Sequence, residues 1–203
     1  QLHRLLNSVT GIDRMTNGNT VVLLTADHGE MLGDHYFWRK SLPYEGAARI
    51  PLLVRAPKRF GIQPGTVIDR PVALQDIAPT VLDMAGVDTP GTMEGCSLWP
   101  LLRGETDMPW RDWLHLEHAG GWHALTDGHE KYVWWTRDGR EQLFDLDTDP
   151  SECHDLAGDD GSETCLSPWR ERLIGTLANR PEGFSDGTRL VTGRPYGNVI
   201  TRA

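Results

Sequence analysis

The sequence predicts an α/β fold in which a mainly parallel sheet is flanked by helices and is followed by a small antiparallel sheet with a C-terminal helix. Strand and helix patterns alternate in the first half of the chain, which is typical of βα units on a parallel sheet. In the second half, strand-like runs are separated by glycine-containing pairs that favour hairpin turns. We therefore expect residues 1–109 to form part of an α/β domain, residues 110–180 a small sheet plus helix, and residues 181–203 an extended tail.

The first expected elements are a helix and a buried strand. Apolar residues recur at helical spacing over residues 2–12, and Asn17-Gly18 ends the pattern. Residues 21–24 are apolar and rich in β-branched side chains, as in a strand buried within a parallel sheet. Residues 50–54 predict a second strand, which Pro57 ends.

Shorter elements complete the first half. Residues 43–48 allow a short helix, and residues 72–74 are typical of a third short strand. Asp76 is a suitable N-cap for a helix that extends to Met84. Residues 90–105 predict a loop with one helical turn.

The second half predicts a four-stranded antiparallel meander. Its strand-like runs are residues 113–118, 122–126, 131–135 and 142–145. A helix over residues 168–179 carries apolar side chains on one side, so we expect it to cover one face of the sheet. Residues 181–203 are rich in Gly, Arg and Pro, which favours extended or poorly ordered chain.

Composition limits the partners. The formal charge is −9 and no basic cluster is present, so nucleic acid is not expected as a partner. No apolar run in this segment reaches membrane-spanning length.

The three cysteines leave the compartment open. Cys153 and Cys165 flank an acidic loop and would pair across it in an exported protein, whereas free thiols are the alternative; Cys96 has no obvious partner. The compartment therefore stays open between bacterial cytoplasm and periplasm.

The candidate site follows the strand at residues 21–24. Asp27 and His28 lie just beyond its carboxyl end, where α/β sheets collect their ligands. Carboxylate oxygen and imidazole nitrogen together suit a divalent cation. Lys40 follows on the same loop, and a metal with an ammonium group can bind a tetrahedral oxyanion and stabilise charge as a bond breaks. Taken singly, each residue also fits an ordinary role, Asp27 as a loop acid and Lys40 as a solvated surface charge.

These residues belong to a longer pattern. Residues 25–57 resemble the second conserved block of the type I sulfatases, within the alkaline phosphatase superfamily. Asp27-His28 is similar to the family's metal-binding pair, an acidic residue followed by Asn or His. Lys40 is similar to the family's sulfate-contacting lysine, and residues 49–52 are similar to the Arg-Val-Pro-Leu segment at the start of a strand. Further similar segments occur in family order at residues 74–82, 97–104 and 143–150.

The resemblance implies an alkaline-phosphatase-like fold and hydrolysis of a sulfate ester of a small molecule or sugar. It implies that Asp27 and His28 hold a divalent cation, calcium first with manganese or magnesium as alternatives, and that Lys40 holds a sulfate oxygen near the scissile bond. His35, His118 and His123 are candidates for substrate binding. For His35 a structural role in its loop is the favoured alternative, and His118 and His123 have the alternative of ordinary hairpin residues.

One part of the family pattern is missing. The formylglycine motif places Pro two residues after its Cys or Ser, but in the segment that begins at Cys165 the order is Ser167 and then Pro168. The resemblance therefore implies that formylglycine and two further acidic ligands come from the N-terminal half of the same protein, and that this C-terminal fragment is inactive alone. The alternatives are a phosphonate or phosphate ester hydrolase of the same superfamily and a non-catalytic binding module built on the tryptophan-bearing meander.

Overall fold

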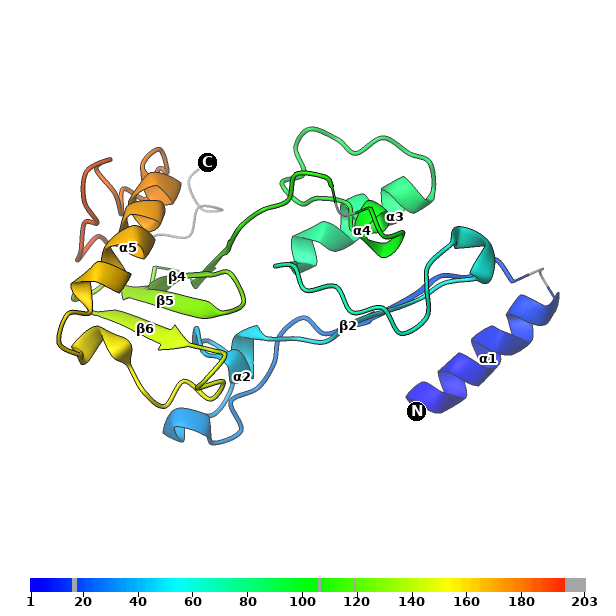
Figure 1. Ribbon diagram of the computed structural model, residues 1–203, viewed down its shortest axis with the longest axis horizontal. Helices are drawn as coiled ribbons and strands as arrows, with labels where there is room; N and C mark the ends of the chain where they lie inside the picture. Colours follow the sequence, from blue (N-terminus) through cyan, green and yellow to red (C-terminus); the bar gives the residue numbers. More distant parts are fainter. Residues whose placement is uncertain (16–17, 106, 119, 196–203) are drawn as a thin grey trace. The chain divides into compact units, whose positions relative to one another are not determined.

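The structure is a computed structural model that describes residues 1–15, 18–105, 107–118 and 120–195 (Figure 1). It forms two compact units. The first comprises residues 1–27 and 50–109, and the second comprises residues 28–49 and the chain from residue 110 onward. Contacts thus group residues 28–49 with the second half of the chain, whereas the sequence placed them in the first domain.

The first unit begins with the predicted helix, α1 (Leu2–Met15). Its apolar residues repeat at helical spacing, yet Leu5 and Ile12 are 61% and 56% exposed. The predicted end at Asn17 lies outside the described residues, and Gly18 has a φ of 63° that suits glycine beyond a helix end.

The two strands of this unit pair with each other. β1 (Val22–Thr25) runs antiparallel to β2 (Leu52–Arg55), with Thr25 opposite Leu52. Both strands were predicted, but the expected parallel and buried setting of the first is wrong for this chain, because its neighbour is antiparallel and its residues are half-buried. A short apolar run carries no information about the direction of its neighbour.

A buried aspartate organises the rest of the first unit. Asp76 is fully buried between the 3₁₀ turn Leu74–Asp76 and α3 (Ile77–Met84). Its carboxylate accepts hydrogen bonds from the backbone N–H groups of Ala73 and Cys96, both at 2.8 Å. The predicted N-cap position is confirmed, but the predicted strand over residues 72–74 is wrong, because the carboxylate tightens this segment into a turn.

The link from Asp76 to Cys96 also places α4 (Trp99–Leu102), the predicted helical turn. Thr80 extends the connection, since its hydroxyl donates to the Asp76 carbonyl at 2.5 Å and accepts from the Leu98 N–H at 2.8 Å. Two of the segments that resemble sulfatases are therefore joined by buried hydrogen bonds and serve the architecture of this unit.

The second unit is built on the predicted meander. Its strands are β3 (Leu114–His118), β4 (Trp122–Thr126), β5 (Glu130–Trp135) and β6 (Glu141–Asp145). They pair antiparallel in chain order. Gly128 and Gly139 have positive φ angles in two of the hairpin turns, as the turn pairs predicted, and Ala119 of the first turn lies outside the described residues.

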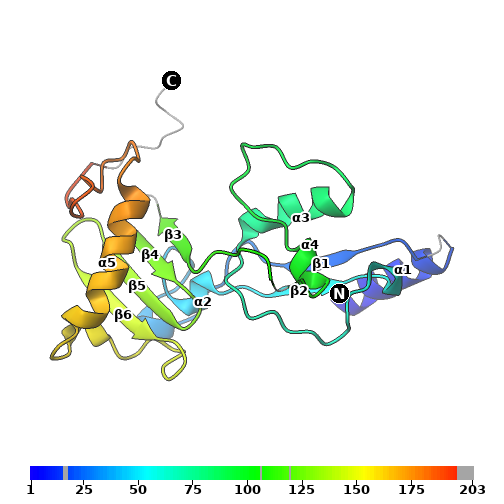
Figure 2. The same ribbon diagram turned by 45° about the horizontal axis from the view of Figure 1, so that its top comes forward.

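Each face of this sheet is covered by a different part of the chain. α5 (Glu163–Leu177) lies along one face (Figure 2). Trp169 and Leu173 of this helix belong to one buried core cluster with Tyr132 and Trp134 of the sheet. On the other face, α2 (Glu45–Ala48) and the loop before it pack on Val133 and its neighbours. The prediction that the C-terminal helix covers one face is confirmed.

Two boundaries near the C-terminus differ from the predictions. α5 begins at Glu163, so Pro168 lies inside the helix although proline, which lacks an N–H, favoured a start there. The segment predicted as an extended tail is folded up to residue 195, since Phe184 is 2% exposed in the core and Ser185 pairs with Leu190 in an isolated bridge. The predicted tail beyond residue 195 lies outside the described residues.

A buried lysine joins α2 to the sheet. Lys131 of β5 is fully buried, and its ammonium lies 2.6 Å from Glu45 Oε1 and 2.8 Å from Glu152 Oε1. Glu152 also accepts the Glu45 N–H at 2.5 Å, which fixes the start of α2. Burial raises the pKa of Glu152, and Lys131 opposes this rise by stabilising the carboxylate.

Two open points from the sequence are also answered. Cys96, Cys153 and Cys165 all lie among the described residues, and all three are exposed free thiols, so the pairing of Cys153 with Cys165 does not occur. Among the helices of the described residues, none has both the length and the apolarity needed to cross a bilayer.

Candidate functional site

The candidate site begins where the chain leaves β1. Asp27 is exposed and His28 is half-buried. The next residue, Gly29, donates its N–H to the Ala47 carbonyl at 2.9 Å. A Cβ atom at this position would lie 2.2 Å from the Gly46 carbonyl oxygen, so only glycine permits this approach to α2.

The loop then folds back and returns Lys40 to His28. Backbone hydrogen bonds from Met31 N to Arg39 O and from Gly33 N to Phe37 O, both 2.9 Å, close this loop. Met31 is fully buried in the core beside α2, which anchors the loop to the sheet.

Lys40 and His28 are in direct contact. Lys40 Nζ lies 2.7 Å from His28 Nε2, and His28 Nδ1 lies 2.7 Å from the Gly29 carbonyl oxygen. Because a carbonyl only accepts hydrogen bonds, the neutral ring carries its proton on Nδ1 and presents the lone pair of Nε2. A cation, the Lys40 ammonium, already interacts with that lone pair. The arrangement therefore suits a metal-ligating imidazole, as the sequence suggested for His28.

The loop backbone is unusual for its sequence. Four non-glycine residues have positive φ angles; they are Leu32 (49°), His35 (51°), Tyr36 (63°) and Arg39 (77°). Left-handed backbone at such residues is unfavourable and tends to cluster at functional sites. All four residues lie between His28 and Lys40, the two residues that this loop brings into contact.

His35 is fixed within this unit. Its ring stacks on Tyr44 with centroids 4.1 Å apart, and its Nε2 lies 3.0 Å from the Ser151 carbonyl oxygen. These contacts favour the structural alternative, in which His35 holds the loop against the chain that follows β6. Glu45 and Arg49 also make structural contacts, since their ion pair of 3.6 Å lies next to Lys131.

The two histidines of the meander occupy different environments. His118 is exposed at the end of β3, and its role in substrate binding stays a prediction. His123 is 2% exposed and packs against Trp134 and Phe184 on the face covered by α5. The site loop packs on the opposite face, so the position of His123 does not support substrate binding.

Sequence reasoning missed two groups of residues in this unit. Lys131 was not considered because its carboxylate partners are far away in the sequence. His115 was not among the candidate site residues either. The usable signal was that His115 and Glu117 alternate in a predicted strand and that His123 follows a short turn in the next strand, opposite Glu117.

Comparison with known proteins identifies the family. A family model described as N-sulphoglucosamine sulphohydrolase, C-terminal, matches residues 33–178. The chain belongs to this family, as its resemblance to sulfatases predicted.

Individual relatives agree with this placement. An arylsulfatase of Clostridium perfringens (strain 13 / Type A) is 37% identical over 203 residues, covering 98% of this chain and 42% of that protein. The structure of BT4656 in complex with its substrate D-glucosamine-2-N,6-O-disulfate is 28% identical with a TM-score of 0.72, covering 88% of this chain and 38% of the other. The phosphonate monoester hydrolase SpPMH from Silicibacter pomeroyi is also 28% identical, with a TM-score of 0.75 and coverages of 87% and 38%. The fold is thus that of sulfatase structures, and the chain spans less than half the length of these relatives.

Proposed function

We propose that this chain supplies part of the active site of a sulfuric ester hydrolase. The observation that carries the proposal is the 2.7 Å contact between Lys40 Nζ and His28 Nε2, on a loop that follows a strand end. Membership of the sulphohydrolase family gives this pair its chemical context.

Lys40 provides the group that binds the anionic ester. Its exposed ammonium carries three donors on a flexible stem, so it can leave His28 and donate to a sulfate oxygen. A charge-assisted hydrogen bond at the leaving-group oxygen stabilises the negative charge that develops there as the ester bond breaks.

Asp27 and His28 would hold a divalent cation beside Lys40. The tautomer of His28, set by the contact of its Nδ1 with the Gly29 carbonyl, leaves Nε2 as the ligating atom. A bound cation supplies Lewis-acid neutralisation of the ester oxygens. Calcium is the cation that the sulfatase resemblance suggests, and the imidazole donor also suits manganese.

The proposal requires residues from outside this chain. A formylglycine nucleophile and two further acidic ligands are expected in another part of the same protein. A complete protein that lacks them would instead support the alternative of a non-catalytic binding module. The substrate class is a sulfate ester of a small molecule or sugar, and the likeness to BT4656 with its disulfated glucosamine supports a sugar.

A second candidate is a phosphonate or phosphate ester hydrolase of the same superfamily. Two observations favour it: His28 offers nitrogen rather than oxygen to the cation, and the fold is similar to that of the phosphonate monoester hydrolase SpPMH. The same Lys40 ammonium would then bind a phosphonate or phosphate oxygen.

One assay of the complete protein separates these functions. Bound metal is removed with a chelator, and calcium or manganese is added back. Each preparation is then assayed in parallel with an aryl sulfate, an aryl phosphodiester and an aryl phosphonate monoester. We expect the highest kcat/KM for the aryl sulfate. A higher value for the phosphonate or phosphodiester would assign the second function, and no turnover of any ester in either metal would support the binding module.

A further inference from the structure

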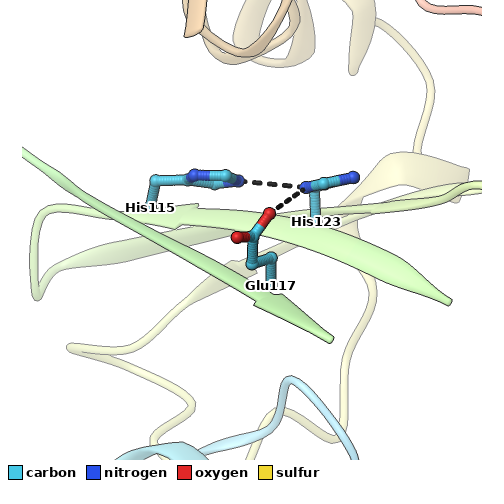
Figure 3. Close-up of side chains that lie close together, drawn as sticks. All are labelled: His115, Glu117 and His123. Carbon is cyan, nitrogen blue, oxygen red and sulfur yellow. Dashed lines mark hydrogen bonds and ion pairs between the residues drawn. The ribbon is translucent and has the colours of Figure 1, made fainter. Parts of the chain in front are cut away.

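Three side chains of the types that can ligate a metal meet at the β3–β4 hairpin (Figure 3). They are His115 and Glu117 of β3 and His123 of β4. Residues two apart in a strand share a face, and Glu117 lies directly opposite His123 in the register. The pairing of the two strands therefore brings all three side chains to one face of the sheet.

The spacing of their ligand atoms is close to that of a metal site. His115 Nε2 lies 3.0 Å from His123 Nδ1, and Glu117 Oε2 lies 3.5 Å from the same nitrogen. Each residue offers one ligand atom, and all three atoms lie within 4.8 Å of one another. Ligands of a tetrahedral zinc ion, at about 2.0–2.1 Å from the metal, lie roughly 3.3 Å apart. The exposed Glu117 side chain can make the remaining adjustment.

Both imidazoles favour their neutral, ligating form. Burial lowers the pKa of His115, and burial followed by the neighbouring His115 lowers the pKa of His123 to about 4. His123 Nε2 is buried without a hydrogen-bond partner in the described structure. An orphaned N–H would be unfavourable there, so the proton of neutral His123 lies on Nδ1, between the other two ligand atoms.

We propose that His115, Glu117 and His123 form a binding site for zinc or a similar transition-metal cation. Two imidazole nitrogens and one carboxylate oxygen form a zinc-type donor set, and calcium, which prefers oxygen ligands, is disfavoured. The metal replaces the proton shared at His123 Nδ1, and the exposed side of Glu117 leaves a fourth position for water.

This site is separate from the pair of His28 and Lys40. His123 packs on Trp134 and Phe184 of the core under α5, whereas the loop that carries His28 and Lys40 is anchored through Met31 on the opposite face of the sheet. Loss of one site should therefore leave the other intact.

Two features limit the affinity. Arg180 Nη1 lies 2.8 Å from Glu117 Oε2, so the metal competes with a guanidinium for the carboxylate. Arg180 keeps its second partner, Glu182, at 2.9 Å when Glu117 turns to the metal. Coordination also moves the proton of His123 to the buried Nε2, which has no acceptor. We expect a dissociation constant for zinc in roughly the micromolar range, well above the values of closed structural zinc sites.

The test is a metal titration of the complete protein in an Asp27→Ala/His28→Ala background, which removes both ligands that this chain gives to the proposed catalytic cation site. After chelator treatment, zinc is titrated by calorimetry and cobalt by the visible absorption of its four-coordinate complexes. We expect one zinc that is weakened at least tenfold by His115→Gln and by Glu117→Gln. Arg180→Gln should strengthen binding several-fold by removing the competing cation.

His129→Gln is the matched control, because His129 is an exposed histidine in the turn between β4 and β5 and pairs with Asp147 at 3.0 Å. It should leave the zinc affinity unchanged. Equal zinc affinity in the parent, His115→Gln and Glu117→Gln proteins, or a loss caused by His129→Gln alone, would overturn the proposal. Glu117→Gln changes an exposed side chain, so it remains informative if His115→Gln fails to fold.

Discussion

The ammonium nitrogen of Lys40 lies 2.7 Å from Nε2 of His28. The imidazole proton is held at Nδ1 by the Gly29 carbonyl, so the Nε2 lone pair faces a positive charge supplied by the chain itself. In the proposed enzyme His28 would give that lone pair to a divalent cation, and Lys40 would be free to bind the ester. The contact thus holds Lys40 beside the nitrogen to which the proposed cation would bind.

Replacing Lys40 by alanine tests this role. In the complete protein, Lys40→Ala should lower kcat for the preferred ester by about 10²–10³, because a donor to the developing negative charge is lost. Lys40 is exposed, so the free energy of unfolding should change by less than about 0.5 kcal/mol. Steady-state kinetics and urea denaturation measure the two quantities.

The control for Lys40 is Lys58→Ala, which removes an exposed lysine from the turn that follows β2. It should leave both kcat and stability near the parent values. Near-normal turnover by the Lys40→Ala protein would remove Lys40 from the catalytic machinery.

Gly29 sets how closely the site loop approaches α2. An added Cβ would lie 2.2 Å from the Gly46 carbonyl oxygen, so Gly29→Ala must displace backbone rather than a flexible side chain. We expect a loss of about 1–3 kcal/mol in the free energy of unfolding and a fall in kcat, because His28 moves with the loop. Gly11→Ala, in open space on α1, should instead be neutral or stabilising by up to about 1 kcal/mol. Equal stability of the two variants would contradict the close approach.

Much of the second unit was predictable because its signals are local. The strands of the meander alternate with turns such as Asp127-Gly128, and the hairpins follow from those pairs without distant information. The proximity of His28 and Lys40 was also predictable, since both residues lie on one short segment after a strand.

The failed predictions depended on contacts between distant residues. Residues 72–74 do not form a strand, because the carboxylate of Asp76 accepts the Ala73 N–H and is itself buried and held by the N–H of Cys96, 20 positions away. Phe184 lies in the core under α5, which no local pattern in a segment rich in Gly, Arg and Pro indicates. Lys131 is buried because Glu45 and Glu152, 86 and 21 positions away, converge on its ammonium.

Lys131 provides a stability test of that convergence. Lys131→Met keeps an unbranched chain of similar length but leaves the carboxylates of Glu45 and Glu152 close together without a cation. The free energy of unfolding should fall by about 3–5 kcal/mol, as when one partner of a buried ion pair is removed. Combining Lys131→Met with Glu152→Gln should recover part of the loss. Urea denaturation, monitored by tryptophan fluorescence, measures the free energy of unfolding of both variants. A loss below about 1 kcal/mol for Lys131→Met would show that the pairing contributes little to stability.

His123 should make the stability of the protein depend on pH. Its pKa is about 4 in the folded chain, mainly because of burial, and about 6.5 in the unfolded chain. The unfolded state therefore binds more protons between these two values, so the stability is fully present above about pH 6.5 and is lost as the pH falls toward 4. From pH 7 to pH 5 the loss should be about 2 kcal/mol, measured by urea denaturation at each pH.

His123→Asn, whose side-chain amide reaches the position of Nδ1, should remove most of this dependence of stability on pH while retaining a polar contact with Glu117. An unchanged slope in that variant would assign the pH dependence to other groups, with His115 as the first to replace because burial lowers its pKa in the same direction.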